Sequence, residues 1–113
     1  MVEDYAPKRG DVVWITLYPQ AGHEQAERRP AVVLSPAAYN VKVWLAIVRP
    51  ITSSVKGHPF EVIIPDGIAV AGVIPADQVK SLDWRTRDAT LMSHLPPETM
   101  PDVLQKLNLL LKD

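Results

Sequence analysis

Cysteine is absent from the 113 residues of this chain. The protein therefore has neither a disulfide framework nor a metal site built on thiolates. Long hydrophobic runs are missing as well: no apolar segment approaches the ~18 residues that a membrane helix needs, and the charged N-terminus lacks the apolar core of a signal peptide. The absence of cysteine is compatible with a reducing cytosol, and we expect a cytoplasmic protein with no membrane partner.

A large net charge is absent too. Lys and Arg number 12 against 13 Asp and Glu, which gives a formal net charge of −1. Bulk electrostatics therefore do not identify a nucleic-acid-binding protein. The three histidines are widely spaced and have no nearby carboxylate at ligand spacing, so we expect no zinc site, no other metal and no cofactor. Any function must depend on a local arrangement of side chains.

Proline, in contrast, is abundant. Most of the 11 prolines lie at the ends of short apolar segments, where they punctuate a β fold rather than mark disorder. Several of these segments alternate between apolar and polar residues, as strands do, whereas the C-terminal segment follows helical spacing. We expect one domain over residues 1–113, mainly β: a small, SH3-like, partly open β-barrel with a C-terminal α-helix. The predicted strands cover residues 11–18, 31–34, 43–49, 60–64, 68–74, 79–84 and 89–95; residues 37–42 form a turn or short helix, and the final helix has Pro97 at an early position.

Residues 22–35 change character midway. Residues 22–29 are polar and charged, whereas residues 31–34 form a compact apolar run typical of a buried strand. Pro30 stands at the junction, and its ring disfavours a helical backbone at Arg29. We therefore expect Arg29 to be a permanent cation at the mouth of a strand, after a loop over residues 20–28. From charge spacing alone, a surface ion pair between Glu24 and Arg29 is the more ordinary interpretation.

A second polar segment, residues 52–58, follows the most apolar predicted strand and contains Thr52, Ser53 and Lys56. If the two strand ends are neighbours, these side chains converge with Arg29 and Glu24. Such a set suits the cleavage of RNA. A base removes the proton of a ribose hydroxyl, the hydroxyl attacks the adjacent phosphorus, and cations and hydroxyl donors stabilise the developing negative charge while an acid protonates the leaving oxygen. The reaction needs no metal, because the nucleophile belongs to the substrate.

The whole pattern resembles the MazF/PemK toxins, the ribonuclease components of toxin–antitoxin pairs. The resemblance is carried by residues 22–35, Gly-His-Glu-Gln-Ala-Glu-Arg-Arg-Pro-Ala-Val-Val-Leu-Ser. Further matching blocks are residues 10–14, residues 51–62 and residues 76–85, so the similarity spans nearly the whole chain in the right order. It implies the SH3-like barrel, a homodimer and a small antitoxin partner of the MazE type.

In that family, the Arg and Thr that match Arg29 and Thr52 are regarded as the catalytic pair, and the position of Glu24 is tied to activity. Whether Glu24 or Arg29 acts as the general base stays open, since Glu24 serves equally well as a partner that orients Arg29. The three tryptophans are expected in the core, with Trp84 as the exception, because an aromatic ring beside cations suits a single-stranded RNA groove. The predicted RNA contacts are His23, Gln25, Arg28, Ser53, Lys56, Gln78, Lys80, Trp84, Arg85 and Arg87.

The leading prediction is a sequence-specific, metal-independent endoribonuclease toxin of a type II toxin–antitoxin system. It cleaves single-stranded mRNA, leaves a cyclic phosphate and a 5′ hydroxyl, and so inhibits translation and growth. A groove lined by Arg29, Lys56, Arg85 and Arg87 is expected to hold RNA and an acidic antitoxin segment in turn. Two alternatives stand beside it. An SH3-like binding module would need an exposed aromatic and acidic groove, and a gyrase-poisoning toxin of similar fold would not need the pair of Arg29 and Thr52.

Overall fold

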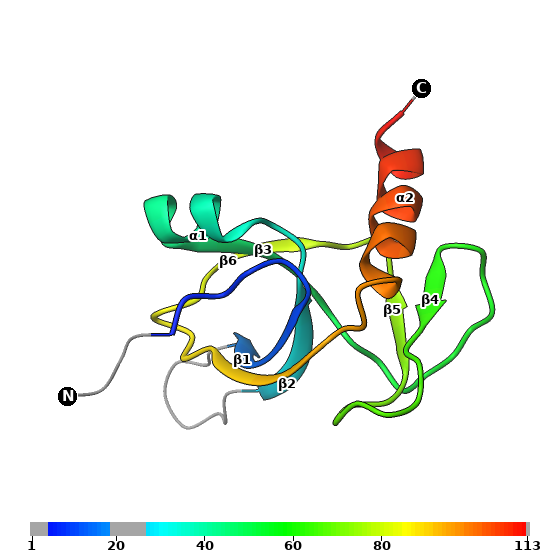
Figure 1. Cartoon of the computed structure of the whole chain (residues 1–113), viewed down its shortest axis with the longest axis horizontal. Helices are drawn as coiled ribbons and strands as arrows, with labels where there is room; N and C mark the ends of the chain where they lie inside the picture. The colour runs from blue at the N-terminus through cyan, green and yellow to red at the C-terminus, as the bar shows by residue number, and fades with distance from the viewer. Residues whose placement is uncertain (1–4, 19–26, 113) are drawn as a thin grey trace.

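The computed structural model describes residues 5–18 and 27–112 (Figure 1). A main sheet, a small two-stranded sheet and two helices make up this part of the chain. Their order is β1 (Asp11–Tyr18), β2 (Glu27–Val33), α1 (Ala37–Val43), β3 (Leu45–Pro50), β4 (Glu61–Ile63), β5 (Val73–Pro75), β6 (Lys80–Asp83), β7 (Thr90–His94) and α2 (Thr99–Leu111).

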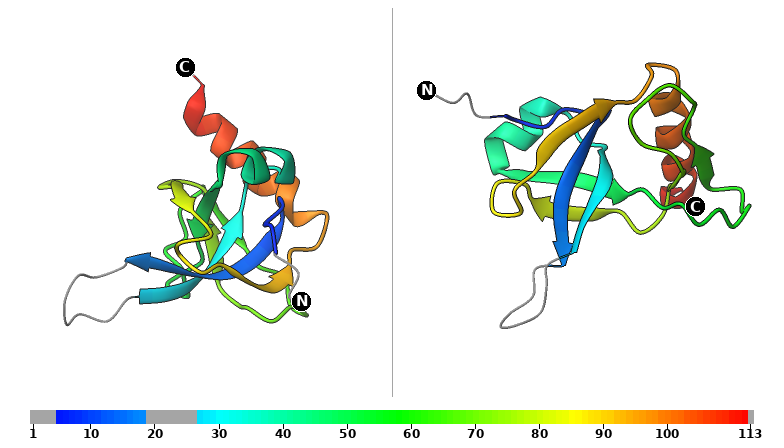
Figure 2. Two further views of the ribbon diagram at one scale, coloured as in Figure 1. Left: turned by 90° about the vertical axis from the view of Figure 1, so that its left-hand side faces the viewer. Right: turned by 90° about the horizontal axis from the view of Figure 1, so that it is seen from below.

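The main sheet has five strands in the order β6-β3-β2-β1-β7, and every neighbouring pair is antiparallel. It curls but does not close, so it forms a partly open barrel, whereas β4 and β5 make a separate two-stranded sheet (Figure 2). The helices lie at opposite ends, with α2 beside β4 and β5. The expected mainly β fold with a C-terminal helix is thereby confirmed.

Both faces of β1 contribute residues to a core, because the curled sheet encloses one core and α2 covers another. Val12 packs with α2 and with β4 and β5, and Val13 and Ile15 pack inside the curl. This is the alternation that the sequence predicts for residues 11–18. Trp14 lies on the Val12 face but is 38% exposed, so it is outside the core.

The largest difference from the predicted strands is in β2, which begins at Glu27 rather than at residue 31. Arg28 pairs with Thr16 and Arg29 pairs with Ile15, so both arginines belong to the ladder instead of to a loop. Exposure falls along the strand from Glu27 to the fully buried Ala31–Val33 stretch. Apolar patterning detected only the buried half of the strand.

Two other boundaries are set by the backbone. Trp44 adopts the left-handed conformation, with φ of 64°, and its N–H bonds to the Asn40 carbonyl at the end of α1. The strand expected over 43–49 therefore begins at Leu45. The strand expected over 68–74 is reduced to β5, since Gly72 has φ of 131° just before it. Helix α2 begins at Thr99, so Pro97 precedes it. No helix within the described ranges has the length and apolar character to cross a membrane.

Candidate active site

A cavity of about 320 Å³ lies where the end of β3, the segment after it, β5 and the start of β6 meet. We call it the Arg29 cavity. It contains cations, hydroxyl groups and two carboxylates within reach of one bound molecule. Its lining residues are Leu17, Arg29, Arg49, Pro50, Thr52, Ser54, Lys56, His58, Glu61, Pro75, Asp77, Gln78 and Lys80.

Arg29 and Thr52 are brought to this cavity by a double link between β2 and the segment after β3. The Ile51 N–H donates to the Pro30 carbonyl over 2.9 Å, and the Arg29 Nη2 donates to the Ile51 carbonyl over 3.0 Å. Because Thr52 follows Ile51, the Arg29 guanidinium is held beside the main chain that carries the Thr52 hydroxyl. Glu27 lies 3.6 Å from Arg29 as an ion-pair partner, and the Arg29 side chain keeps 36% of its surface exposed.

Thr52 lies outside the regular ladders and is held by one antiparallel bridge to Val73. Its N–H donates to the Val73 carbonyl over 3.1 Å, and its carbonyl accepts from the Val73 N–H over 2.9 Å. The Thr52 Oγ1 accepts a hydrogen bond from the Ser54 N–H at 3.0 Å. No residue within 5–18 and 27–112 accepts the Thr52 hydroxyl proton in a hydrogen bond, so within this part of the chain the proton can serve a ligand in the cavity. Ser54 lines the cavity and Ser53, the predicted contact, does not.

Lys56 is placed by Glu61, which sequence reasoning did not select, although it lies in a block that resembles the toxin family. The Glu61 carboxylate accepts from the backbone N–H groups of Lys56 and Gly57 over 3.1 and 2.8 Å, and His58 Nε2 lies 3.7 Å away. Burial raises the pKa of Glu61, but those two hydrogen bonds and the charges of His58 and Lys56 outweigh it, so the pKa of Glu61 is lowered. Glu61 therefore stays ionised and anchors the loop.

Arg49 is a second fixed cation that the sequence analysis missed, because it lies inside the most apolar strand. Its side chain is only 13% exposed, and its Nε donates to the Pro75 carbonyl over 2.8 Å. Asp77 lies 4.0 Å from its Nη2. Among the described residues, four cations (Arg29, Arg49, Lys56 and Lys80) line the cavity against the carboxylates of Glu61 and Asp77. This excess of positive charge suits a phosphodiester backbone.

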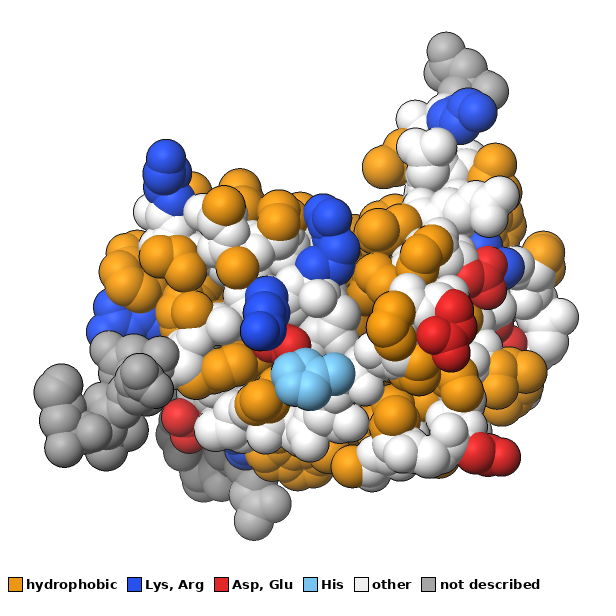
Figure 3. All heavy atoms as spheres, in the orientation of Figure 1, with side chains coloured by type: hydrophobic (Ala, Val, Ile, Leu, Met, Phe, Trp, Pro, Cys, Tyr) orange, Lys and Arg blue, Asp and Glu red, His pale blue; other side chains and the backbone are white. Residues whose placement is uncertain are grey.

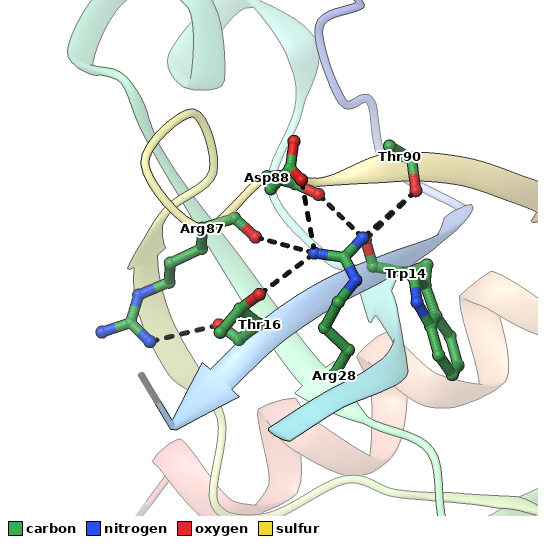
Figure 4. Close-up of polar contacts among 6 residues, drawn as sticks. All are labelled: Trp14, Thr16, Arg28, Arg87, Asp88 and Thr90. Atoms are coloured by element: carbon green, nitrogen blue, oxygen red, sulfur yellow. Dashed lines mark hydrogen bonds and ion pairs between the residues drawn. The ribbon is translucent and has the colours of Figure 1, made fainter. Parts of the chain in front are cut away.

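Arg28 and Arg87, both predicted to contact RNA, instead tie the strands together (Figure 4). Arg28 donates to the Trp14 carbonyl over 3.0 Å and to the Asp88 carbonyl over 2.9 Å. Arg87 Nη1 donates to the Leu17 carbonyl over 2.7 Å. Neither residue lines the Arg29 cavity. Their guanidinium groups hold the β1–β2 ribbon against the turn between β6 and β7, and so support β2 where it carries Arg29.

Trp84 and Arg85 lie at a different place, a cavity of about 400 Å³ next to α1 that also contains Trp44. Trp84 is buried, at 6% exposure, and its Nε1 donates to the Asn40 carbonyl. The exposed ring is that of Trp44, with the Arg85 guanidinium 4.2 Å from its centre. The structure therefore does not bring Arg85 and Arg87 into one cavity with Arg29 and Lys56, and the ring of Trp84 is largely covered.

The structure thus brings together Arg29, Thr52, Lys56, Gln78 and Lys80 from the predicted set. His23, Glu24 and Gln25 lie outside the described residues. Within residues 5–18 and 27–112, no group of three or more His, Asp or Glu side chains is placed to hold a metal ion. The arrangement offers fixed positive charge and a hydroxyl donor, which together can stabilise negative charge that develops on a phosphate.

Comparisons with known proteins define the class of protein to which this chain belongs. Residues 8–111 match the family described as PemK-like, MazF-like toxin of type II toxin–antitoxin system, and the chain belongs to that family. It is 45% identical to the endoribonuclease toxin MazF of Escherichia coli K12, over 98% of this chain and 99% of the relative. It is 33% identical to the endoribonuclease PemK of E. coli, over 92% of this chain and 81% of the relative. Among solved structures, MazE–MazF (Form-II) from Deinococcus radiodurans superposes with a TM-score of 0.88 and 50% identity, covering 96% of this chain and 97% of that chain.

Proposed function

We propose that this toxin is a sequence-specific endoribonuclease that cleaves single-stranded mRNA in the cytoplasm and so inhibits translation and growth. The observation that carries the proposal is the Arg29 cavity, where a guanidinium is fixed beside Thr52 among further cations. The curated relatives of this chain are named endoribonucleases, which supports the same activity. The cationic lining does not favour a proline-rich peptide, since such ligands prefer an aromatic groove.

The roles follow from the charge of each group. A guanidinium is a permanent cation, so Arg29 stabilises the negative charge of the pentacoordinate phosphate better than it removes a proton. The Thr52 hydroxyl donates to a phosphate oxygen, and Arg49 and Lys56 add positive charge along the backbone of the RNA. Glu24 is then the candidate base that takes the proton of the ribose hydroxyl. As the hydroxyl oxygen bonds to phosphorus, the bond to the 5′ oxygen breaks and this leaving oxygen takes a proton from a general acid or from water, which leaves a cyclic phosphate and a 5′ hydroxyl.

The direct test is cleavage of a long single-stranded RNA in EDTA by the purified protein. We expect a small set of discrete fragments, because a sequence-specific enzyme cuts at few positions. Thr52→Val, prepared in the same way, is the matched control, since it keeps the volume of Thr52 and removes its hydroxyl. An RNA that stays intact at high protein concentration would contradict the proposal, and equal cutting by both preparations would show that the cleavage does not depend on the Thr52 hydroxyl.

We also propose that the toxin is a homodimer. Exposed apolar side chains gather on and beside α2 (Figure 3). Leu111, at the end of α2, is 76% exposed, and Ile63 of β4 is 71% exposed. Apolar patches of this kind usually mark an interface. Sedimentation at micromolar concentration should give twice the 12.5 kDa mass of the chain. A single monomeric species would refute the dimer.

Control by an antitoxin is the remaining part of the proposal. Relatives include MazE–MazF complexes and a mycobacterial endoribonuclease solved with its cognate antitoxin. A cavity lined by Arg29, Arg49 and Lys56 attracts carboxylates as well as phosphates. We therefore propose a MazE-like partner with an acidic segment that is disordered alone and orders over this cavity. Ordering takes about 2–5 kcal/mol from the gross interaction, so the interface must be broad.

We expect that partner to compete with RNA, and to bind more weakly as salt is raised, because screening weakens contacts between exposed charges. The measurement is displacement of an uncleavable, fluorescently labelled RNA by the antitoxin at several salt concentrations. Inhibition of cleavage with unchanged RNA affinity would contradict occlusion of the cavity and indicate a remote site.

A further inference from the structure

Gly72 lies directly against the main chain of Thr52. A Cβ atom added at Gly72 would overlap the Thr52 carbonyl oxygen and stand 3.1 Å from the Thr52 carbonyl carbon and 3.4 Å from the Ser53 Cα. All three of these atoms belong to the backbone, so no side chain can rotate away to make room. Gly72 also has φ of 131°, a conformation that residues with a Cβ rarely adopt.

The close approach completes the support under Thr52. Val73, the residue after Gly72, exchanges two hydrogen bonds with Thr52, and the Gly72 carbonyl accepts from the Ile64 N–H over 2.9 Å. Gly72 is thereby held between the end of β4 and the Thr52 backbone. Because Thr52 belongs to none of the named strands, this bridge is its principal backbone restraint among the described residues.

We propose that Gly72 is a positioning residue for Thr52: the missing side chain lets the strand that begins at Val73 approach closely enough to fix the Thr52 hydroxyl in the Arg29 cavity. The inference rests on the catalytic role proposed for Thr52. Any side chain at position 72 displaces the Thr52 carbonyl, and a displacement of about 1 Å in a catalytic group can cost about 100-fold in rate. In the sequence, Gly72 was only an interruption of an expected strand.

Gly67 provides a matched control. It precedes the same strand, has φ of 102°, and has no atom within 4 Å of an added Cβ. Gly67→Ala therefore introduces comparable backbone strain without contact with Thr52. We expect Gly72→Ala to lower the single-turnover cleavage rate at saturating RNA by about 10- to 100-fold, with RNA affinity within about twofold of wild type. Gly67→Ala should cut at nearly the wild-type rate, even if both variants lose similar thermal stability.

A coupling measurement separates positioning from a general structural effect. Gly72→Ala should have little further effect on the rate in a Thr52→Ala background, since residues that act through one group are not additive. Independent effects of the two substitutions, or a folded Gly72→Ala that cuts at the wild-type rate, would overturn the proposal.

A readout that does not depend on activity keeps this inference separate from the proposed function. In NMR spectra, Gly72→Ala should shift the amide resonances of Thr52 and of Ser54, whose N–H bonds to the Thr52 Oγ1. If the wild type fails to cut RNA, the proposed function falls while these shifts still test the contact. If Gly72→Ala does not fold, amide exchange of the wild type decides: we expect slow exchange at Thr52 and Val73, and exchange at unprotected rates would overturn the proposal.

Discussion

Replacement of Arg29 by alanine should abolish RNA cleavage and leave the domain folded. The guanidinium supplies a fixed positive charge beside Thr52, and removal of one such donor to a developing negative charge costs about 10²–10³ in rate. The cost in stability should be small. The side chain is 36% exposed, so the change loses one hydrogen bond to the Ile51 carbonyl, worth about 1 kcal/mol, and a surface ion pair worth less than that.

The measurement is the single-turnover cleavage rate together with thermal unfolding of the same preparations. Arg85→Ala is the matched control, because it removes an arginine next to Trp44 and outside the Arg29 cavity. It should keep a rate close to wild type. The cleavage rate of Arg29→Lys should lie between those of Arg29→Ala and the wild type, since an ammonium keeps the charge but not the planar geometry of the guanidinium. A folded Arg29→Ala protein that cuts near the wild-type rate would show that the role assigned to Arg29 is wrong.

Much of the fold follows from apolar patterning, because a strand with one buried side has a period of two. β1 matches the predicted 11–18 segment for that reason. The first half of β2 was missed because Arg28 and Arg29 satisfy the ladder with their backbones while their side chains are polar. This contrast shows that the apolar pattern of a sequence indicates which side chains are buried. It therefore detects a strand only where side chains of that strand are buried.

The candidate site was predictable where a motif fixes the residue type, as for Arg29 and Thr52. It was not predictable where the role of a side chain depends on the neighbouring strand. Arg28, Arg85 and Arg87 are chemically as suited to phosphate as Arg29, yet the structure directs them elsewhere. Arg49, in contrast, lines the cavity but could not be selected from the sequence, because it lies in an apolar strand and its carbonyl partner at Pro75 belongs to a distant segment. Long-range pairing decides which of the arginines line the Arg29 cavity.

A single 2′-deoxyribose placed immediately before the scissile bond should make an RNA resistant to cleavage. The proposed nucleophile is the hydroxyl of that ribose, and no other group of the mechanism replaces it. The cut position must first be found by mapping fragment ends on a long RNA. Those ends should carry a cyclic phosphate on one fragment and a 5′ hydroxyl on the other.

The matched control is the same RNA with its deoxyribose one nucleotide further along, which keeps the reacting hydroxyl and should be cut at nearly the normal rate. The resistant RNA should still bind, because the contacts proposed for Arg49, Lys56 and Lys80 are with the backbone phosphates rather than with the hydroxyl; it should therefore inhibit cleavage of the unmodified RNA. Raised salt should weaken that inhibition, as it does for any contact built on phosphate charge. Efficient cutting of the modified RNA would mean that water is the nucleophile, and the Arg29 cavity would then have to position a water molecule opposite the leaving 5′ oxygen.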